Sequence, residues 1–144
     1  MSRLKSKQRE IAAAVLGISV AVILWLTIFH RETVVEDSLA YRPLHSLMSF
    51  WSNIKKQGVR GNFLGNIMIF MPVGLLYPIA FCSEIDKKMK RTILFGFCLS
   101  SLIELTQLLF SKGYFDVDDI FLNTLGALIG YGLYKAILRK SSND

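Results

Sequence analysis

The apolar residues of this chain are gathered into four long blocks. The blocks cover residues 11–29, 62–82, 92–110 and 120–138. Each is close to the ~20 residues that a helix needs to cross the hydrocarbon core of a bilayer. Apolar side chains occur on every side of these blocks, whereas the helices of a small soluble domain carry one apolar face. The pattern predicts an all-α, polytopic membrane helical bundle with four transmembrane helices, since helices satisfy the backbone polar groups inside a bilayer.

A shorter apolar pattern lies between the first two blocks. Its apolar positions recur at i, i+3, i+4, i+7 and i+10, and they are Leu44, Leu47, Met48, Trp51 and Ile54. Such a stripe predicts an amphipathic helix lying in the membrane interface. A lid packed over the mouth of the bundle is an alternative that the sequence leaves open.

Charge changes the picture by giving the helices an orientation. The 144 residues suit a single domain, residues 1–144, and the net charge is +6. Both tails and the loop after the second block hold eleven of the 17 basic residues, and the two other loops hold six. The positive-inside rule then places both termini in the cytoplasm and loops 31–61 and 111–116 outside. Basic charge is an orientation signal here, so we expect a lipid bilayer and no nucleic acid as a partner.

Polar side chains lie within or just before the last three blocks, near their predicted outer ends. They are Asn62 and Asn66, then Glu104 and Gln107 with Ser100 or Ser101 one turn deeper, then Asp116, Asp118, Asp119 and Asn123. Spacings of three or four residues place the members of a pair on one helix face. At 1.5 Å per residue, Asn66, Glu104 and Asn123 lie at similar depths of roughly 6–9 Å. A buried charge costs about 3 kcal/mol to insert and avoids lipid, so we expect these residues to line an outward-facing polar pocket.

Structural explanations compete with this functional interpretation. One of the three aspartates can cap the fourth helix, and the amides can bridge helices by hydrogen bonds. Glu104 is the hardest to explain in this way, and we expect it to have a functional role. We expect no cofactor; the Asp-x-Asp pattern at 116–118 leaves a divalent cation such as Mg²⁺ as an open alternative.

Glycine and proline predict how the helices pack. Pro72 lies mid-way along the second block, where it removes a helical hydrogen bond and favours a kink. Gly126 and Gly130 form a G-x-x-x-G pair, which lets a neighbouring helix approach closely. We expect the same packing role for Gly65 and Gly74.

Three segments of the chain resemble the signature segments of the VanZ-like family of small bacterial membrane proteins. The segments read NFLGNIMIFMPVGLLYP, SLIELTQ and DVDDIFLNTLGALIGY, and the resemblance covers residues 60–131. The matching positions are Asn66, Phe70, Pro72, Gly74, Glu104, Gln107, Asp116, Asp118, Asp119, Asn123, Gly126 and Gly130. The family often has an arginine shortly before the acidic segment, whereas this chain has Gly113 with Lys112 beside it.

The resemblance implies resistance to teicoplanin-type lipoglycopeptide antibiotics in Gram-positive bacteria, and it implies no particular reaction. One hypothesis is a non-enzymatic envelope protein whose pocket binds a lipid-linked cell-wall precursor or the acylated drug. The alternative is a membrane-embedded hydrolase or transferase in which Glu104, Asp116 and Asp119 act as general acid and base on a lipid-linked substrate. An ion-coupled carrier ranks third, because four spans without repeats are few for alternating access.

Overall fold

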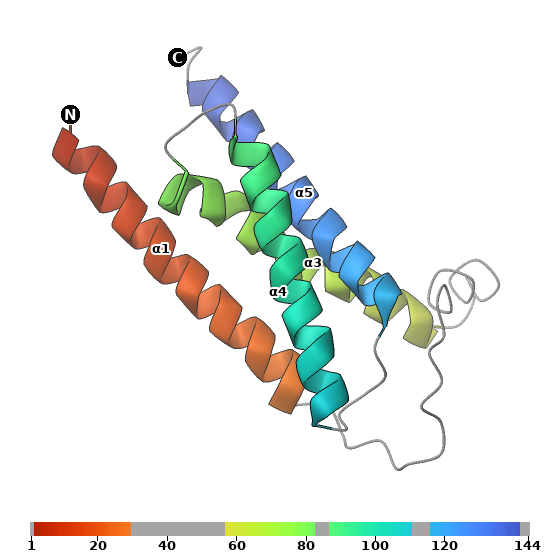
Figure 1. Cartoon of the computed structure of the whole chain (residues 1–144). Helices are drawn as coiled ribbons and strands as arrows, with labels where there is room; N and C mark the ends of the chain where they lie inside the picture. The colour runs from red at the N-terminus through yellow and green to blue at the C-terminus, as the bar shows by residue number, and fades with distance from the viewer. Residues whose placement is uncertain (1, 30–56, 83–86, 111–115, 142–144) are drawn as a thin grey trace, which may run out of the picture.

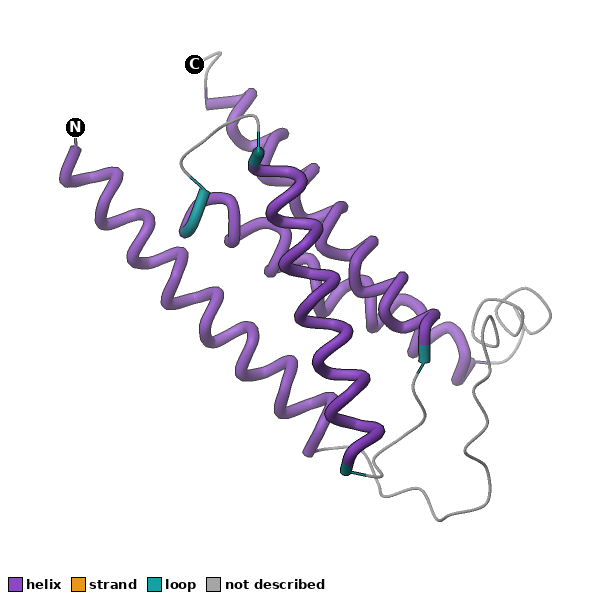
Figure 2. The backbone as a smooth tube through the Cα atoms, in the orientation of Figure 1, coloured by secondary structure: helices purple, strands orange, loops and turns teal. Residues whose placement is uncertain are grey.

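The computed structural model describes residues 2–29, 57–82, 87–110 and 116–141, apart from the side chains of residues 2–5, 29, 57–62 and 141. Apart from a few loop residues at the helix ends, the described residues form helices and no strand, as Figures 1 and 2 show. The helices are α1 (Ser2–Leu24), its π-helical continuation η1 (Trp25–Phe29), α3 (Gln57–Ala80), α4 (Lys88–Leu109) and α5 (Val117–Ser141). The predicted all-α fold is confirmed. The predicted interfacial helix lies outside the described residues.

Four helical stretches are long and apolar enough to cross a membrane. They are Ser6–Ile28, Phe63–Ala80, Lys88–Leu109 and Val117–Lys140. Their bounds differ from the predicted blocks by only a few residues, except that the helices continue into charged flanks such as the basic tail before residue 11. Charged flanks extend a helix without extending its apolar block, because lysine and arginine are good helix formers.

The outer faces of the helices are apolar. Ile18, Met68, Leu109 and Phe121 are each more than 60% exposed. A water-soluble protein would not expose so much contiguous apolar surface, whereas lipid tails would cover it without cost. The interior contains an apolar core formed by Leu16, Ile23, Phe70, Val73 and Ile103, but it also contains polar side chains.

Glycines bring α3 and α5 into backbone contact, and this is the most extensive helix pair in the bundle. A Cβ placed on Gly126 would lie 2.2 Å from the Ile67 carbonyl oxygen, and one on Gly130 would lie 2.1 Å from the Met71 carbonyl oxygen. No side chain fits at such distances. The G-x-x-x-G pair of α5 therefore rests directly on the backbone of α3.

The glycines and the proline of α3 differ from one another. A Cβ on Gly74 would lie 1.9 Å from the Ala127 carbonyl oxygen, so Gly74 completes the contact with α5. Gly65 shows no such contact: a Cβ there meets nothing within 4 Å among the described residues, because this glycine lies on an exposed face of α3. Pro72 lies inside α3, which continues as a helix to Ala80.

Both termini lie at the same end of the bundle, as Figure 1 shows. Consequently η1, the end of α4 and the beginnings of α3 and α5 all lie toward the opposite end. This arrangement brings the polar residues of α3, α4 and α5 to one level of the bundle.

Candidate functional site

Most of the buried polar side chains belong to the end of α4 and the beginning of α5. We call the following group the polar cluster: Asn66, Ser100, Glu104, Gln107, Asp116, Asp118, Asp119 and Asn123. All but Asn66 and Asp116 are buried, and those two are partly buried. A polar group buried in a membrane helix bundle needs a hydrogen-bond partner. The partners therefore show what holds each side chain in place.

Asn66 and Asp119 join α3 to α5. The Asn66 Nδ2 donates a hydrogen bond to the Asp119 Oδ1. Two short side chains can meet across this interface because Gly126 and Gly130, one and two turns further along α5 than Asn123, keep the helix backbones close. The bond is charge-assisted if the carboxyl group is ionised, which makes it stronger than a bond between neutral groups.

Asp116 caps α5. Its Oδ1 accepts a hydrogen bond from the Asp118 backbone N–H at 2.9 Å, and its carbonyl oxygen accepts from the Ile120 N–H at 3.4 Å. This is the arrangement of an N-cap residue. Asp118 and Asp119 lie in the first turn, where negative charge complements the helix dipole. One of the three aspartates thus has the capping role that was predicted as an alternative.

Glu104 supports the same helix start from α4. Its Oε2 accepts a hydrogen bond from the Asp116 backbone N–H at 2.9 Å, and the residue is 1% exposed. In a capping box a glutamate inside the helix accepts from the N-cap N–H. Here the glutamate comes from a neighbouring helix, so the bond also fastens α4 to α5. This interaction gives a structural reason for a carboxyl group at this depth.

Gln107 makes the complementary bond one turn further along α4. Its Nε2 donates to the Thr27 carbonyl oxygen in η1 at 3.1 Å. The last carbonyl groups of a helix lack intrahelical donors, so an amide N–H from outside satisfies one of them. The two neighbouring positions therefore differ for a chemical reason: the carboxylate at Glu104 accepts from a helix N-terminus, and the amide at Gln107 donates to a helix C-terminus.

Asn123 lies deeper in the bundle. Its Nδ2 donates to the Ser100 Oγ at 2.9 Å, and both side chains are buried. The Asn123 Oδ1 is buried and has no hydrogen-bond partner among the described residues. An unpaired buried acceptor costs about 1–3 kcal/mol, so this oxygen is a place where a donor group from water or a ligand would be stabilised.

The sequence profile of the VanZ/LLP1 family matches residues 16–139. The chain belongs to this family. Protein VanZ from Enterococcus faecium is 29% identical to it over 127 residues, which are 86% of this chain and 73% of that protein. No solved structure matches. Together with the four apolar helices, membership of the VanZ/LLP1 family makes this a membrane protein.

The region matched by the VanZ/LLP1 profile contains the whole polar cluster. Within it the structure links Asn66 to Asp119, Glu104 to Asp116 and Asn123 to Ser100, and it directs Gln107 to η1. Ser100, rather than Ser101, is the deeper serine of the site. Asn62 belongs to the first turns of α3, but its side chain lies outside the described part, as does Lys112.

A metal site receives no support from the described part of this VanZ/LLP1 protein. No three His, Cys, Asp or Glu side chains gather there in a way that would hold a metal ion. In the Asp-x-Asp pattern, the Asp116 Oδ1 turns back to the Asp118 backbone N–H instead of forming an open pair of carboxylates. No cofactor is established.

One partner in the cluster was missed by the sequence analysis. The acceptor for Gln107 is the backbone carbonyl oxygen of Thr27. A carbonyl group belongs to every residue, so side-chain identity contains no signal for it. The only available signal was position: Thr27 lies near the end of an apolar block, where helix carbonyls become unpaired.

Proposed function

We propose that this VanZ/LLP1 protein contributes to resistance to teicoplanin-type lipoglycopeptide antibiotics without catalysing a reaction. In this proposal the polar cluster lines an outward-facing pocket that binds a lipid-linked cell-wall precursor or the acylated drug. The membrane fold and the family support the proposal, and the topology with cytoplasmic termini is part of it. That topology is supported by the excess of basic residues at the ends of the chain.

The observation that carries the proposal is the buried Asn123 Oδ1, which has no hydrogen-bond partner among the residues that the structure describes, in a cluster that also contains buried carboxyl groups. An amide oxygen and carboxylates accept hydrogen bonds, so they favour a ligand rich in N–H and O–H donors. Peptide and sugar groups, which the drug and the wall precursor both have, supply such donors. The acids Glu104 and Asp119 would repel a pyrophosphate, so we place the peptide or sugar part of the ligand in the cluster.

The proposal can be tested by removing charge from the cluster without removing hydrogen-bond acceptors. In cells that depend on the protein for protection, Glu104→Gln and Asp119→Asn keep an oxygen that can accept from the Asp116 N–H and from Asn66, respectively. We expect the teicoplanin concentration that inhibits growth to fall to the value for cells without the protein. Glu10→Gln is the matched control, because Glu10 is exposed on α1 and bonds only Ser6 among the described residues.

Equal amounts of each variant in the membrane must be verified by immunoblotting. If Glu104→Gln and Asp119→Asn protect as well as Glu10→Gln at equal abundance, the cluster has no role in protection. If all three variants lose protection equally, the loss reflects charge in general rather than this site.

A second candidate is a membrane-embedded hydrolase or transferase. The observation in its favour is that the Glu104 carboxyl group contacts the start of the helix that carries Asp116 and Asp119. Carboxyl groups from adjacent helices are the requirement for paired general acid and base catalysis. Incubation of the purified protein with lipid-linked wall intermediates, followed by mass spectrometry, tests this candidate; unchanged masses with and without divalent cations would exclude it.

A further inference from the structure

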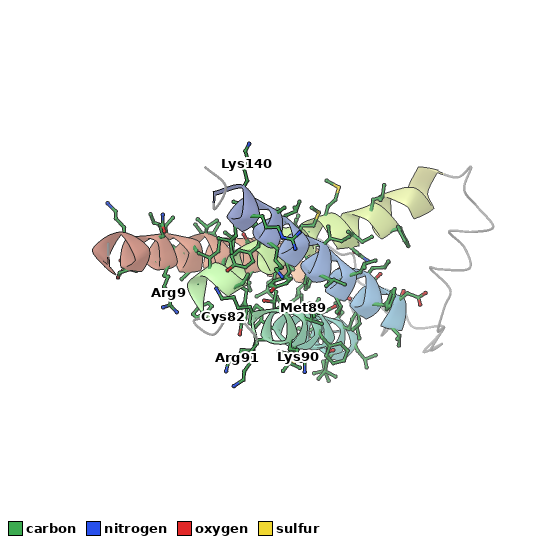
Figure 3. All side chains as sticks on the ribbon, turned by 90° about the horizontal axis from the view of Figure 1, so that it is seen from above. Arg9, Cys82, Met89, Lys90, Arg91 and Lys140 are labelled. Atoms are coloured by element: carbon green, nitrogen blue, oxygen red, sulfur yellow. The ribbon has the colours of Figure 1, made fainter. Side chains whose placement is uncertain are left out.

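The end of the bundle that carries both termini, opposite to the polar cluster, is strongly basic. The basic side chains described there are Lys7, Arg9, Lys87, Lys88, Lys90, Arg91, Lys135, Arg139 and Lys140. Glu10 is the acidic side chain in the described part of this end. Figure 3 looks onto this end and shows Arg9 and Arg91 on one side of the bundle, with Lys140 on the opposite side. Arg9 and Arg91 therefore share one side of this end, and Lys140 lies away from them.

Arg9 is anchored on the last turn of α3. Its Nε donates a hydrogen bond to the carbonyl oxygen of Ala80, the final residue of α3, at 3.3 Å. Helix C-terminal carbonyls lack intrahelical donors and attract cations. This bond holds the guanidinium group beside the end of α3, and Arg9 as a whole is exposed at the bundle surface.

Arg91 approaches the same turn from α4. It lies four residues before Phe95, so the two side chains share a face of α4. The Phe95 ring stacks on the ring of Tyr77 with 4.5 Å between centroids, and Tyr77 lies one turn before Ala80 on α3. The last turn of α3 thus lies between an arginine of α1 and an arginine of α4.

The helices that carry the two arginines are separated by α3 at this level. α4 meets the first span at η1, near the opposite end, while α1 itself packs on α3. Figure 1 shows α1 and α4 diverging toward the end that carries the termini. Apolar side chains are exposed further along both helices, among them Val15 on α1 and Leu94 on α4. A ligand between the arginines would therefore meet cations at the surface and hydrocarbon below it.

We infer that Arg9 and Arg91 bind the headgroup phosphate of one anionic phospholipid over the last turn of α3, with the acyl chains lying along α1 and α4. Guanidinium groups present paired N–H donors that match two phosphate oxygens, and they give up hydration more readily than ammonium groups. Basic groups between transmembrane helices at the headgroup level are a known type of anionic lipid site. The inference is independent of the proposed function, which concerns the other end of the bundle.

The test measures lipid binding to the purified full chain in a neutral detergent by native mass spectrometry. Phosphatidylglycerol is compared with phosphatidylcholine of the same acyl chains and with inorganic phosphate. We expect phosphatidylglycerol to bind and the other two to bind at least about tenfold more weakly. The double variant Arg9→Gln/Arg91→Gln should weaken phosphatidylglycerol binding by about 25-fold, since each basic group at the headgroup level contributes about fivefold.

The matched control is Arg139→Gln/Lys140→Gln, which removes two charges from the same end but from the last turn of α5. It should weaken binding by less than about threefold, because exposed charges beyond the site are screened. Equal losses in the two double variants would mean diffuse attraction and would overturn the inference. Equal binding of the two lipids would overturn it as well, and so would displacement of the lipid by inorganic phosphate.

Folding of the variants is checked by far-UV circular dichroism. If the double glutamine variant does not fold, Arg9→Lys/Arg91→Lys replaces it. That variant keeps both charges and loses the paired donors, so the bound phosphate should be held about threefold to tenfold more weakly. Unchanged binding would show that the geometry of the guanidinium groups has no part in the site.

Discussion

Replacement of Gly130 by alanine tests the backbone contact between α3 and α5 most directly. A Cβ at this position would lie 2.1 Å from the Met71 carbonyl oxygen, about 1.3 Å short of the 3.4 Å at which ordinary van der Waals contact begins. The obstacle is backbone, which cannot rotate away as a side chain can. The two helices must therefore separate by about 1 Å, and a gap of that size forfeits a quarter to a half of each dispersion contact.

The expected cost of Gly130→Ala is about 1–3 kcal/mol in the free energy of unfolding, the usual range for overpacking. Gly132→Ala is the matched control on the same helix, because a Cβ there meets nothing within 4 Å among the described residues. It should be neutral, or stabilising by up to about 1 kcal/mol, since alanine favours helix more than glycine does. Unfolding of the purified protein by increasing sodium dodecyl sulfate in mixed micelles, followed by circular dichroism, measures both values.

The double variant Gly126→Ala/Gly130→Ala sharpens the experiment. The clash at Gly126 is with the Ile67 carbonyl oxygen at 2.2 Å, so both substitutions require the same separation of α3 and α5. Once the first substitution has separated the helices, the second should cost much less than it does alone. The close contact in the structure is wrong if Gly130→Ala is as stable as Gly132→Ala. It is also wrong if the double variant loses as much free energy of unfolding as the two single variants lose together.

Three further predictions concern the polar cluster, and the same unfolding assay measures them. A double-mutant cycle of Asn66→Ala and Asp119→Ala should give a coupling of at least about 0.6 kcal/mol, the average for polar pairs between membrane helices; zero coupling would show that the two side chains do not interact. Asp116→Ala should destabilise the protein by about 0.5–2 kcal/mol, while Asp116→Ser should restore most of the loss because serine also caps; equal losses would contradict the capping role. Glu104→Leu should cost about 1–3 kcal/mol because it leaves the Asp116 N–H without its carboxylate acceptor, and Glu104→Gln should cost less, since an amide oxygen can accept the same bond.

The four helices that are long and apolar enough to span a membrane could be predicted almost completely from the sequence. Transfer of a helix into lipid depends on the sum of side-chain contributions over about 20 neighbouring residues, and that sum needs no knowledge of the rest of the fold. The four predicted blocks accordingly agree with the four helices that are long and apolar enough to span a membrane.

The candidate site could be predicted in part. The rarity of polar groups within and at the edges of apolar blocks pointed to Asn66, Glu104 and Asp119, and the structure finds hydrogen bonds between helices at all three. Their partners could not be derived in the same way. Glu104 and Gln107 both bond to backbone atoms, and which backbone atoms lie opposite depends on how each helix is rotated and crossed.

Gly65 and Gly126 illustrate the same limit. Both are glycines in apolar helices of this chain, and both were expected to serve packing. The structure brings the Ile67 backbone against Gly126 and leaves Gly65 without a neighbour within 4 Å among the described residues. The difference comes from the rotation of α3 about its own axis, which places Gly65 on an exposed face and turns Ile67 toward α5.

The sequence by itself determined that this is a helical membrane protein and which polar residues accompany its apolar blocks, because both follow from the local cost of moving side chains from water into lipid. Only the tertiary structure decided what those residues do. It turned Glu104 and Gln107 into caps for the ends of other helices and left the Asn123 Oδ1 without a hydrogen-bond partner in the part of the chain that is described. Hydrogen bonds act over about 3 Å and in specific directions, so they depend on the relative placement of helices that are distant in the chain.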